Sequence, residues 1–180
     1  MASPEPSLTV AVREDDHRQG PLTAPVTLVE YGDYECPYCG QAYPIIKAIQ
    51  ASMGDDLCFV FRNFPIETSH PHAKRAAEAA EAAGDQGAFW PMHDRLYEHQ
   101  SHLDTDDLLG YASALGLDTD RFATDLKNHT FADRVEADFS SGVRSGVNGT
   151  PTFFINGVRY DGAWDGETLL GELQAGVSAR

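Results

Sequence analysis

The sequence predicts an α/β protein in which a block of helices is inserted between the two halves of one mixed β-sheet. Three observations lead to this prediction. A strand–helix–strand pattern begins the chain, several helical stretches fill its middle, and a strand–strand–helix pattern ends it. With 180 residues, the chain suits one globular domain that carries an inserted subdomain, rather than several independent domains.

The first half of the predicted sheet follows an N-terminal arm. Residues 1–25 are rich in proline and charge, so we expect a loose arm that contributes at most one edge strand, at Leu8–Val12. Residues 26–31 (VTLVEY) and 57–61 (LCFVF) are short and mostly apolar, as buried parallel strands are. Residues 41–53 have the apolar spacing of a helix. These segments predict a strand–helix–strand unit with a right-handed crossover.

The middle of the chain, from about Pro71 to Val147, is predicted to be helical. Its first stretch is rich in alanine, which has the highest helix propensity. Glycines follow two of the stretches and aspartates precede two, as residues at helix ends and N-caps do. Helices are expected at residues 73–83, 88–100, 105–115, a short stretch after Asp118, and 131–144.

The end of the chain returns to strands. Residues 152–155 (TFFI) and 158–160 flank Asn156-Gly157, the dipeptide that two-residue hairpins favour. A last helix is expected at residues 167–176. Together these elements predict an arm at residues 1–25, a sheet domain at 26–66 and 147–180, and an inserted helical subdomain at 67–146.

The composition excludes several classes of function. The chain has 28 acidic residues against 13 lysines and arginines, a formal net charge of -15. Such a charge repels nucleic-acid phosphates and anionic lipid, so we expect no nucleic-acid partner. No apolar run approaches the roughly 18 residues that cross a bilayer, and the N-terminal residues do not resemble a signal peptide. We therefore expect no membrane insertion and a cytoplasmic location; an exported protein whose signal peptide was removed is the alternative.

The chemistry centres on Cys36-Pro37-Tyr38-Cys39, a CxxC motif between a buried strand and a helix. At a helix N-terminus, unpaired amides and the helix dipole lower the pKa of a thiol from about 8.5 towards neutrality. Pro37 suits the first helical position, where an amide proton has no partner. We expect Cys36 to be the attacking thiolate and Cys39, one turn later and deeper, to resolve the mixed disulfide.

A metal site is the alternative use of a CxxC motif. A structural zinc needs four ligands, and the remaining cysteine, Cys58, lies inside an apolar strand. The histidines of the middle segment complete no set of ligands, so we predict no metal. We interpret Cys58 as an inert core thiol and His70-Pro71-His72 as the start of a helix.

Two further interpretations concern the predicted helices. The aromatic cluster between Phe89 and Tyr97 is expected to be core, with a hydrophobic substrate groove as the alternative. Glu78 and Glu81 are expected to lie on a solvated helix face.

More distant features accompany the CPYC motif. The segment TLVEYGDYE leads into it, and Pro44 lies five residues after Cys39. A helical insertion follows the second strand, and Gly149-Thr150-Pro151 precedes TFFINGV. With these features the chain, from about Val26 to Gly176, resembles the DsbA-like thiol–disulfide oxidoreductases of the thioredoxin superfamily. The resemblance implies a thioredoxin fold, βαβ…ββα around a mixed central sheet, with an inserted helical subdomain.

The resemblance also implies which residues bind substrate. In the family the loop proline is cis and faces the disulfide, so Pro151 is expected to be cis. A cis X–Pro bond leaves the backbone groups beside it exposed, so the backbone of Thr150 would then pair with a substrate strand. Pro37 and Tyr38, between the two cysteines, are assigned to substrate binding as well.

Glu30 is the further catalytic candidate. It lies six residues before Cys36, where the superfamily has a buried acid beneath the second cysteine. A carboxyl group in an apolar strand has a raised pKa and can relay a proton to or from Cys39. A half-solvated glutamate at a strand end is the alternative.

The resemblance implies an enzyme that exchanges disulfides with protein thiols. No organic cofactor or metal is implied, although CPYC also occurs in glutaredoxins, so glutathione is a candidate co-substrate. The redox partner is left open, and a monomer or weak dimer is expected.

The direction of exchange is left open between oxidase and reductase. Tyr38 carries no charge that would pair with the thiolate, and Asp33 and Glu35 oppose its formation if they are ionised. We therefore expect a reduction potential between those of the strong periplasmic oxidants and thioredoxin, and a pKa of Cys36 above about 4.5.

Two other functions fit the same fold. A glutathione-dependent transferase or isomerase of the kappa class does not need the second cysteine, so Cys39→Ser separates it from a disulfide exchanger. A non-catalytic chaperone or accessory module is the other alternative, since similar domains are found appended to membrane transporters.

Overall fold

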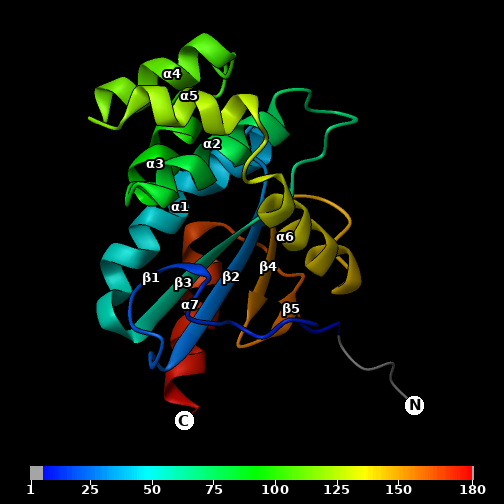
Figure 1. Ribbon diagram of the computed structural model, residues 1–180. Helices are drawn as coiled ribbons and strands as arrows, with labels where there is room; N and C mark the ends of the chain where they lie inside the picture. Colours follow the sequence, from blue (N-terminus) through cyan, green and yellow to red (C-terminus); the bar gives the residue numbers. More distant parts are fainter. Residues whose placement is uncertain (1–5, 180) are drawn as a thin grey trace. The chain divides into compact units, whose positions relative to one another are not determined.

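The computed structural model describes residues 6–179, and within them it contains a five-stranded sheet and seven α-helices (Figure 1). Residues 1–5 of the predicted arm lie outside this description. The predicted α/β class is confirmed, with strands towards both ends of the chain and helices between them. The elements in chain order are β1 (His17–Gln19), β2 (Val26–Gly32), α1 (Pro37–Met53), a 3-10 turn (Gly54–Asp56), β3 (Leu57–Asn63), α2 (Ala73–Asp85), α3 (Phe89–Glu98), α4 (Thr105–Ala114), α5 (Thr119–Lys127), α6 (Ala132–Arg144), β4 (Thr152–Ile155), β5 (Val158–Tyr160) and α7 (Gly166–Ser178).

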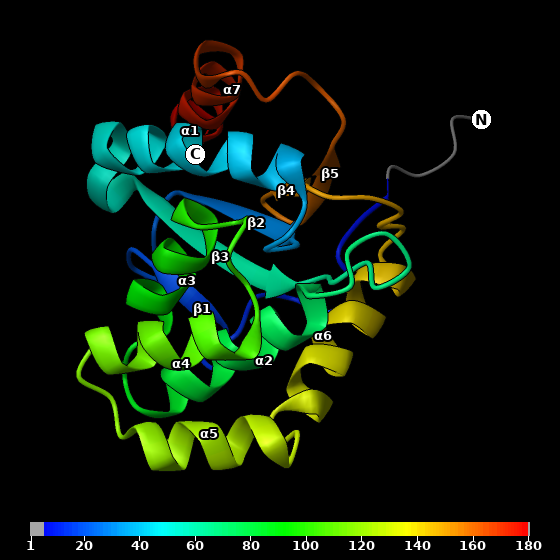
Figure 2. The same cartoon turned by 90° about the horizontal axis from the view of Figure 1, so that it is seen from above.

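The sheet has the strand order β1-β3-β2-β4-β5. Three of its neighbouring pairs are antiparallel: β1 with β3, β2 with β4, and β4 with β5. The neighbours β2 and β3 are connected through α1, and their arrows run in the same direction in Figure 2. The sheet is therefore mixed, as the sequence predicts.

The chain forms two compact units. Unit 1 contains the sheet and comprises Met1–Gly32, Gln41–Arg62 and Ser140–Arg180. Unit 2 contains most of the helices and comprises Asp33–Gly40 and Asn63–Phe139. The domain boundaries expected from the sequence stay a prediction.

Unit 1 is built on strands that are buried on both faces. β2 is buried along nearly its whole length, and so are β3 and β4. The part of α1 beyond Gln41 lies on the same side of the sheet as α7 (Figure 2). The turn between β4 and β5 has φ angles of 50° at Asn156 and 85° at Gly157, the left-handed pair that a type I′ hairpin requires.

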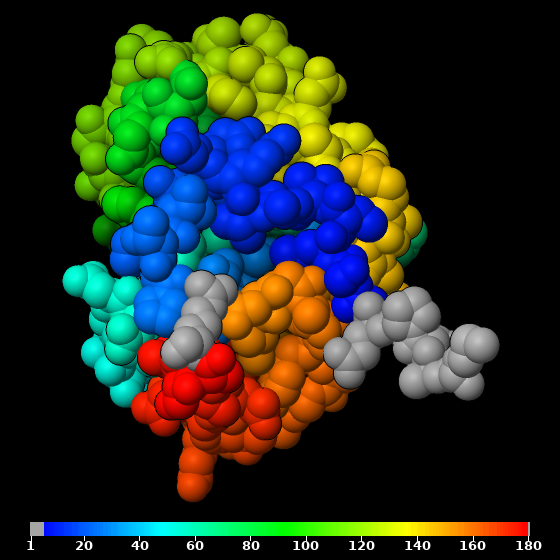
Figure 3. Space-filling model, turned by 90° about the horizontal axis from the view of Figure 1, so that it is seen from below, coloured from blue at the N-terminus to red at the C-terminus, as the bar shows by residue number. Residues whose placement is uncertain are grey.

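The N-terminal arm differs from the prediction, because residues 8–12 form no strand. The strand of the arm is β1, which pairs with β3 at the edge of the sheet. Ser7 forms a single bridge with Val158, and the Leu8 amide donates to the Gly157 carbonyl at 2.9 Å. Figure 3 shows the arm, in dark blue, beside the orange segment that contains β5. The predicted edge strand at Leu8–Val12 is therefore wrong.

The reason lies in Arg62, whose side chain is buried. All five of its N–H groups have acceptors. The Asp16 carboxylate accepts two hydrogen bonds at 2.9 Å and Tyr31 Oη accepts one at 3.0 Å, while the carbonyls of Val10 and Ala11 accept at 2.9 and 3.1 Å. Burial alone would lower the pKa of Arg62, but the hydrogen bonds to Asp16 and Tyr31 raise it. Carbonyls that face this cation are not free to pair with a neighbouring strand.

Unit 2 is arranged around α2, which packs against α3, α4 and α5. Its alanines are buried, and so are Glu78 and Glu81, at 2% and 5% exposed. Glu78 accepts a hydrogen bond from His129 Nδ1 at 3.0 Å, and Glu81 accepts one from Asn63 Nδ2 at 2.7 Å. The interpretation of Glu78 and Glu81 as a solvated face is therefore wrong, because neighbouring helices cover α2 on several sides. None of the described helices has the length and apolarity to cross a membrane.

We predict that Asp16→Asn destabilises the protein by about 3 kcal/mol, because the buried Arg62 cation loses the carboxylate that it contacts at 2.9 Å. The measurement is the free energy of unfolding in urea, followed by far-ultraviolet circular dichroism. Asp15→Asn is the matched control. Asp15 pairs with Arg13, but the two side chains are 64% and 62% exposed, so we expect a change below about 0.5 kcal/mol. Equal losses in the two variants would contradict the role given to Arg62.

Candidate active site

The CPYC motif lies where α1 begins. The helix starts at Pro37, and the Gly40 amide donates to the Cys36 carbonyl at 3.1 Å, which is the first hydrogen bond of the helix ladder. Cys36 therefore occupies the N-cap position, at the helix N-terminus that the sequence predicts. Cys36 is 4% exposed and Cys39 is 0% exposed, whereas Tyr38 is 59% exposed. Two buried thiols thus flank an exposed dipeptide, and Cys39 is the deeper of the two.

The loop before Cys36 is held by one carboxylate, that of the buried residue Asp33. Its Oδ1 atom accepts hydrogen bonds from the amides of Glu35 at 2.8 Å and Cys36 at 3.2 Å. Its Oδ2 atom accepts from the Ile66 amide and from His70 Nδ1, both at 2.8 Å. Asp33 therefore ties the segment that carries Cys36 to the segment between β3 and α2, within unit 2.

A second carboxylate of the same loop has a histidine partner as well. Glu35 accepts from the backbone amide of His72 at 2.6 Å and from its Nδ1 atom at 2.8 Å. His72 Nε2 lies 3.2 Å from the Asp104 carboxylate. A neutral imidazole donates from only one nitrogen, so contacts from both nitrogens to carboxylates fit an imidazolium.

Both histidines are shifted towards the charged form. The hydrogen bond to Glu35 is the largest cause that raises the pKa of His72, and the charges of Glu35 and Asp104 add to it against the opposing effect of burial. Burial lowers the pKa of His70, but the hydrogen bond and charge of Asp33, followed by the charges of Cys36 and Glu35, raise it above its ordinary value. Asp33 and Glu35 are therefore not uncompensated charges beside Cys36.

Sequence reasoning missed this role of His70 and His72, which it interpreted as the start of a helix. α2 does begin directly after them, at Ala73, and His72 makes no side-chain cap. The available sequence signal is the matched spacing: Asp33 and Glu35 are two residues apart, and so are the two histidines.

Gln100 is another residue that sequence reasoning missed. Its Nε2 atom donates to the carbonyls of Tyr34 at 2.9 Å and Cys36 at 2.8 Å. A Cβ atom at Gly40 would lie 2.1 Å from Gln100 Oε1, so the glycine makes room for this side chain. Gln100 thereby fixes the backbone on both sides of Glu35, and nothing in its sequence context indicates this function.

The aromatic cluster of α3 forms part of the core of unit 2. Phe89 and Tyr97 are buried, and the rings of Tyr34 and Tyr97 lie 4.9 Å apart between centroids. Tyr34 Oη lies 3.1 Å from Nδ1 of the buried His93. The interpretation of this cluster as core is confirmed.

The remaining predicted site residues belong to unit 1. Glu30 lies on β2 and is 3% exposed, so the half-solvated alternative is wrong. It is paired with Phe153 of β4, the strand that follows the Thr150–Pro151 bond. That bond is cis, as predicted. The structure thus places Glu30 on β2 and the Thr150–Pro151 bond directly before the neighbouring strand β4, both in unit 1, whereas Cys36, Pro37, Tyr38 and Cys39 lie in unit 2. The chemical roles of these residues stay predictions.

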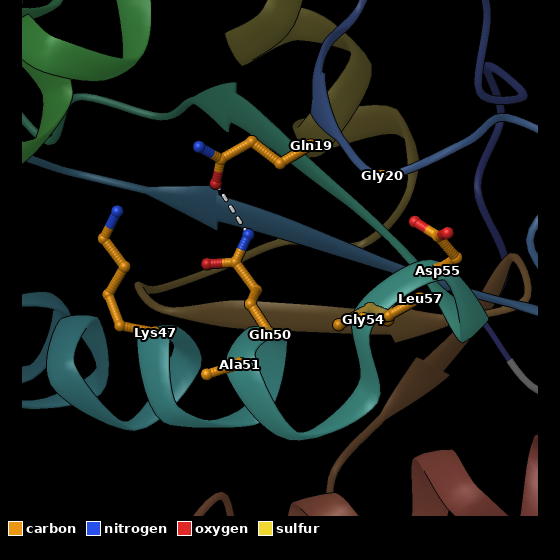
Figure 4. Close-up of a pocket in the computed structure, with 8 residues that line it drawn as sticks. All are labelled: Gln19, Gly20, Lys47, Gln50, Ala51, Gly54, Asp55 and Leu57. Carbon is orange, nitrogen blue, oxygen red and sulfur yellow. Dashed lines mark hydrogen bonds between the residues drawn. The ribbon is translucent and has the colours of Figure 1, made fainter.

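Other parts of the described chain contribute little to this chemistry. Cys58 is buried in β3, and burial raises the pKa of its thiol. Among the described residues no group of three or more histidine, cysteine, aspartate or glutamate side chains is arranged to hold a metal ion. A polar pocket of unit 1 lies between β1 and α1, where Gln50 Nε2 donates to Gln19 Oε1 at 2.6 Å beside Lys47 (Figure 4). None of the predicted site residues lines it.

Comparisons with known proteins agree with this geometry. A sequence model of the thioredoxin family matches residues 13–175. The crystal structure of oxidised BdbD from Bacillus subtilis superposes with a TM-score of 0.81 and 26% identity, over 97% of this chain and 96% of that one. A thioredoxin-like oxidoreductase from Silicibacter pomeroyi DSS-3 superposes with a TM-score of 0.78 and 26% identity, over 93% of this chain and 92% of that one.

A curated relative is of a different kind. The Na(+)/H(+) antiporter NhaA 1 of Salinispora arenicola is 52% identical over 163 residues, which are 90% of this chain but 25% of the antiporter. The chain thus spans about a quarter of the length of the first curated relatives that it matches.

Proposed function

Because this chain belongs to the thioredoxin family and has the fold of DsbA-like thiol–disulfide oxidoreductases, we propose that it exchanges disulfides with protein thiols. The observation that carries the proposal is the CPYC motif at the N-terminus of α1. A thiolate there is stabilised by the helix dipole and the unpaired amides of the first turn. Cys36 is the sulfur that attacks and is attacked, and the deeper Cys39 resolves the mixed disulfide.

The proposed reaction balances in either direction. As an oxidant, the Cys36–Cys39 disulfide is attacked at Cys36 by a substrate thiolate, and Cys39 leaves and takes a proton. A second substrate thiolate then attacks the substrate sulfur of the mixed disulfide and expels Cys36, so two electrons pass from the substrate thiols to the pair. As a reductant, the Cys36 thiolate attacks a substrate disulfide, forms a mixed disulfide and expels the first substrate thiolate, which takes a proton. The Cys39 thiolate then attacks Cys36, forms the Cys36–Cys39 disulfide and expels the second substrate thiolate, so two electrons pass from the pair to the substrate.

The other predicted site residues receive roles under the same proposal. Pro37, Tyr38, Thr150 and Pro151 bind the substrate chain, and the exposure of Tyr38 suits such a contact. Glu30 relays the proton of Cys39, and its burial supports this role. We place the exchange in the cytoplasm, because thiols such as the unpaired Cys58 stay reduced there and because the chain is strongly acidic. In that compartment glutathione is available as a co-substrate.

We predict that Cys39→Ser accumulates a covalent adduct with insulin, a disulfide-bonded protein substrate. Cys36 still attacks the insulin disulfide, but no neighbouring thiol resolves the product. The measurement is the mass of the intact adduct and its loss on addition of dithiothreitol.

Two variants serve as controls for the adduct. Cys36→Ser removes the nucleophile and is expected to form none, and Cys58→Ala is expected to behave as the wild type because Cys58 is buried. An adduct that maps to Cys58, or one that persists in Cys36→Ser, would contradict the assignment. Retained glutathione conjugation in Cys39→Ser without any adduct would favour a kappa-class enzyme.

We predict that the reduction potential of the Cys36–Cys39 pair lies between about -120 and -270 mV, the values of the strong oxidants and thioredoxin. The measurement is equilibration in glutathione buffers, with free thiols counted by mass spectrometry. A value above about -150 mV indicates a disulfide donor and counts against the cytoplasm, and one below about -220 mV indicates a reductase. If no disulfide forms at any ratio of thiol to disulfide, the proposed function is wrong.

A second function, that of an accessory module, is favoured by the antiporter relatives of which this chain spans about a quarter. Under that alternative the domain acts by contact with other polypeptides and its thiols have no role in the function.

We predict that the double variant Cys36→Ser, Cys39→Ser no longer exchanges disulfides and no longer promotes folding of a reduced protein. Suppression of aggregation at the wild-type level by this variant would favour the accessory function instead.

A further inference from the structure

The CPYC loop carries two carboxylates, and each of them contacts a histidine from the segment before α2. We propose that His70 is a positioning residue for the nucleophile: held on Asp33 as an imidazolium, it offsets the carboxylates beside Cys36 and stabilises the Cys36 thiolate. The inference rests on the proposed function of Cys36 and adds to it a residue that sets the charge of the nucleophile at a given pH.

The position of His70 is fixed by several contacts. Its Nδ1 atom lies 2.8 Å from Asp33 Oδ2, while Asp33 Oδ1 accepts the Cys36 amide at 3.2 Å. The His70 amide donates to the Ile66 carbonyl at 2.9 Å, and the Ile66 amide in turn donates to Asp33. The imidazole is therefore linked through one carboxylate to the backbone of the nucleophile.

The surroundings of His70 screen its charge only weakly. Its side chain is 19% exposed and that of Asp33 is 0% exposed. Charge interactions fall off less across a buried carboxylate than across water. A proton on His70 therefore affects the neighbouring charged groups more strongly than a proton on a surface histidine does.

The coupling between His70 and Cys36 works in both directions. The negative charge of Cys36 is one of the causes that raise the pKa of His70, after Asp33 and before Glu35. An interaction between two titrating groups is mutual, so the cation that the thiolate favours stabilises that thiolate by the same free energy.

Among the charged groups around this site, His70 is the cation that we expect to affect the Cys36 thiolate most. The pKa of His72 is set by Glu35 and Asp104, and its side chain is 44% exposed. Glu67 of the segment before α2 and Lys74 of α2 lie 3.8 Å apart on the surface and compensate each other. With both histidines protonated, the carboxylates of Asp33, Glu35 and Asp104 face two cations; with both neutral, all three negative charges are unopposed.

The sign of the pH effect follows from these charges. Because the pKa of His70 is raised, the cation is present at about pH 6.5 and below, and it is lost as the pH rises through the raised value. The support for the thiolate is therefore greatest on the acidic side of neutrality and disappears in alkaline solution.

The test is His70→Asn, measured by alkylation. The asparagine amide nitrogen can still donate to Asp33 where Nδ1 does, so the hydrogen bond is kept and the charge is deleted. The probe is iodoacetamide on the fully reduced protein, with the modification of Cys36 followed by peptide mass spectrometry. At about pH 6 we expect Cys36 of the variant to react about threefold to tenfold more slowly than that of the wild type, and the two rates to converge at about pH 9.

His129→Asn is the matched control. His129 also pairs with a buried carboxylate, Glu78 at 3.0 Å, but that carboxylate lies on α2 and not in the CPYC loop. Its φ angle of 51° suits asparagine, so the substitution is expected to be tolerated and to leave the alkylation of Cys36 unchanged.

Two outcomes would overturn the inference. One is an unchanged alkylation rate in His70→Asn at about pH 6. The other is a slower rate with the same ratio at every pH, since that would show a displaced loop and not a lost charge. Formation of the Cys36–Cys39 disulfide by the wild type in glutathione buffer distinguishes failure of this inference from failure of the proposed function. If that disulfide forms and either outcome above is found, only the role of His70 is wrong.

Discussion

The buried carboxylate of Asp33 is the constraint on which the candidate site depends. Four donors converge on it, two from the backbone of the CPYC loop and two from the segment that ends at α2. A buried charge is tolerated only when its hydrogen bonds are satisfied, so neither segment can move away without leaving the other with unpaired groups. The Cys36 amide is one of those four donors, so the same carboxylate also fixes the backbone at the start of α1.

Arg62 plays the corresponding part in unit 1. Its five donors hold the arm at Val10, Ala11 and Asp16, together with Tyr31 of β2. In both units a single buried charge joins segments that are distant in the sequence. Apolar contacts alone would fix the relative positions of these segments less specifically. Such buried charges favour one arrangement of the segments around them, but they make the protein sensitive to mutation. Removal of a single partner leaves a charge buried without compensation.

The sequence was sufficient for features that are encoded locally. Short apolar runs, helix propensity and the Asn156-Gly157 dipeptide placed most elements within a few residues, and the motif placed Cys36 at a helix N-terminus. The misplaced edge strand and the burial of Glu78 and Glu81 depend on partners distant in the chain, which no local pattern contains. The same holds for the pairs Asp33–His70 and Glu35–His72: their residues are 37 positions apart and meet only because the fold brings two loops together.

This arrangement bears on how the chain can tune its chemistry. A cation in the dipeptide between the cysteines would stabilise a thiolate directly, but that dipeptide is exposed, with Tyr38 at 59%. Placing the compensating charges on the segment before α2 separates the two tasks. Tyr38 of the dipeptide is exposed, whereas the histidines that pair with the carboxylates beside Cys36 lie on a different segment. Under the proposed function, substrate contacts made by the dipeptide can change without a change in the charges beside Cys36. In the sequence, the acidic residues of the loop argue against a thiolate at Cys36; in the structure, the same carboxylates hold the histidines that we propose support one.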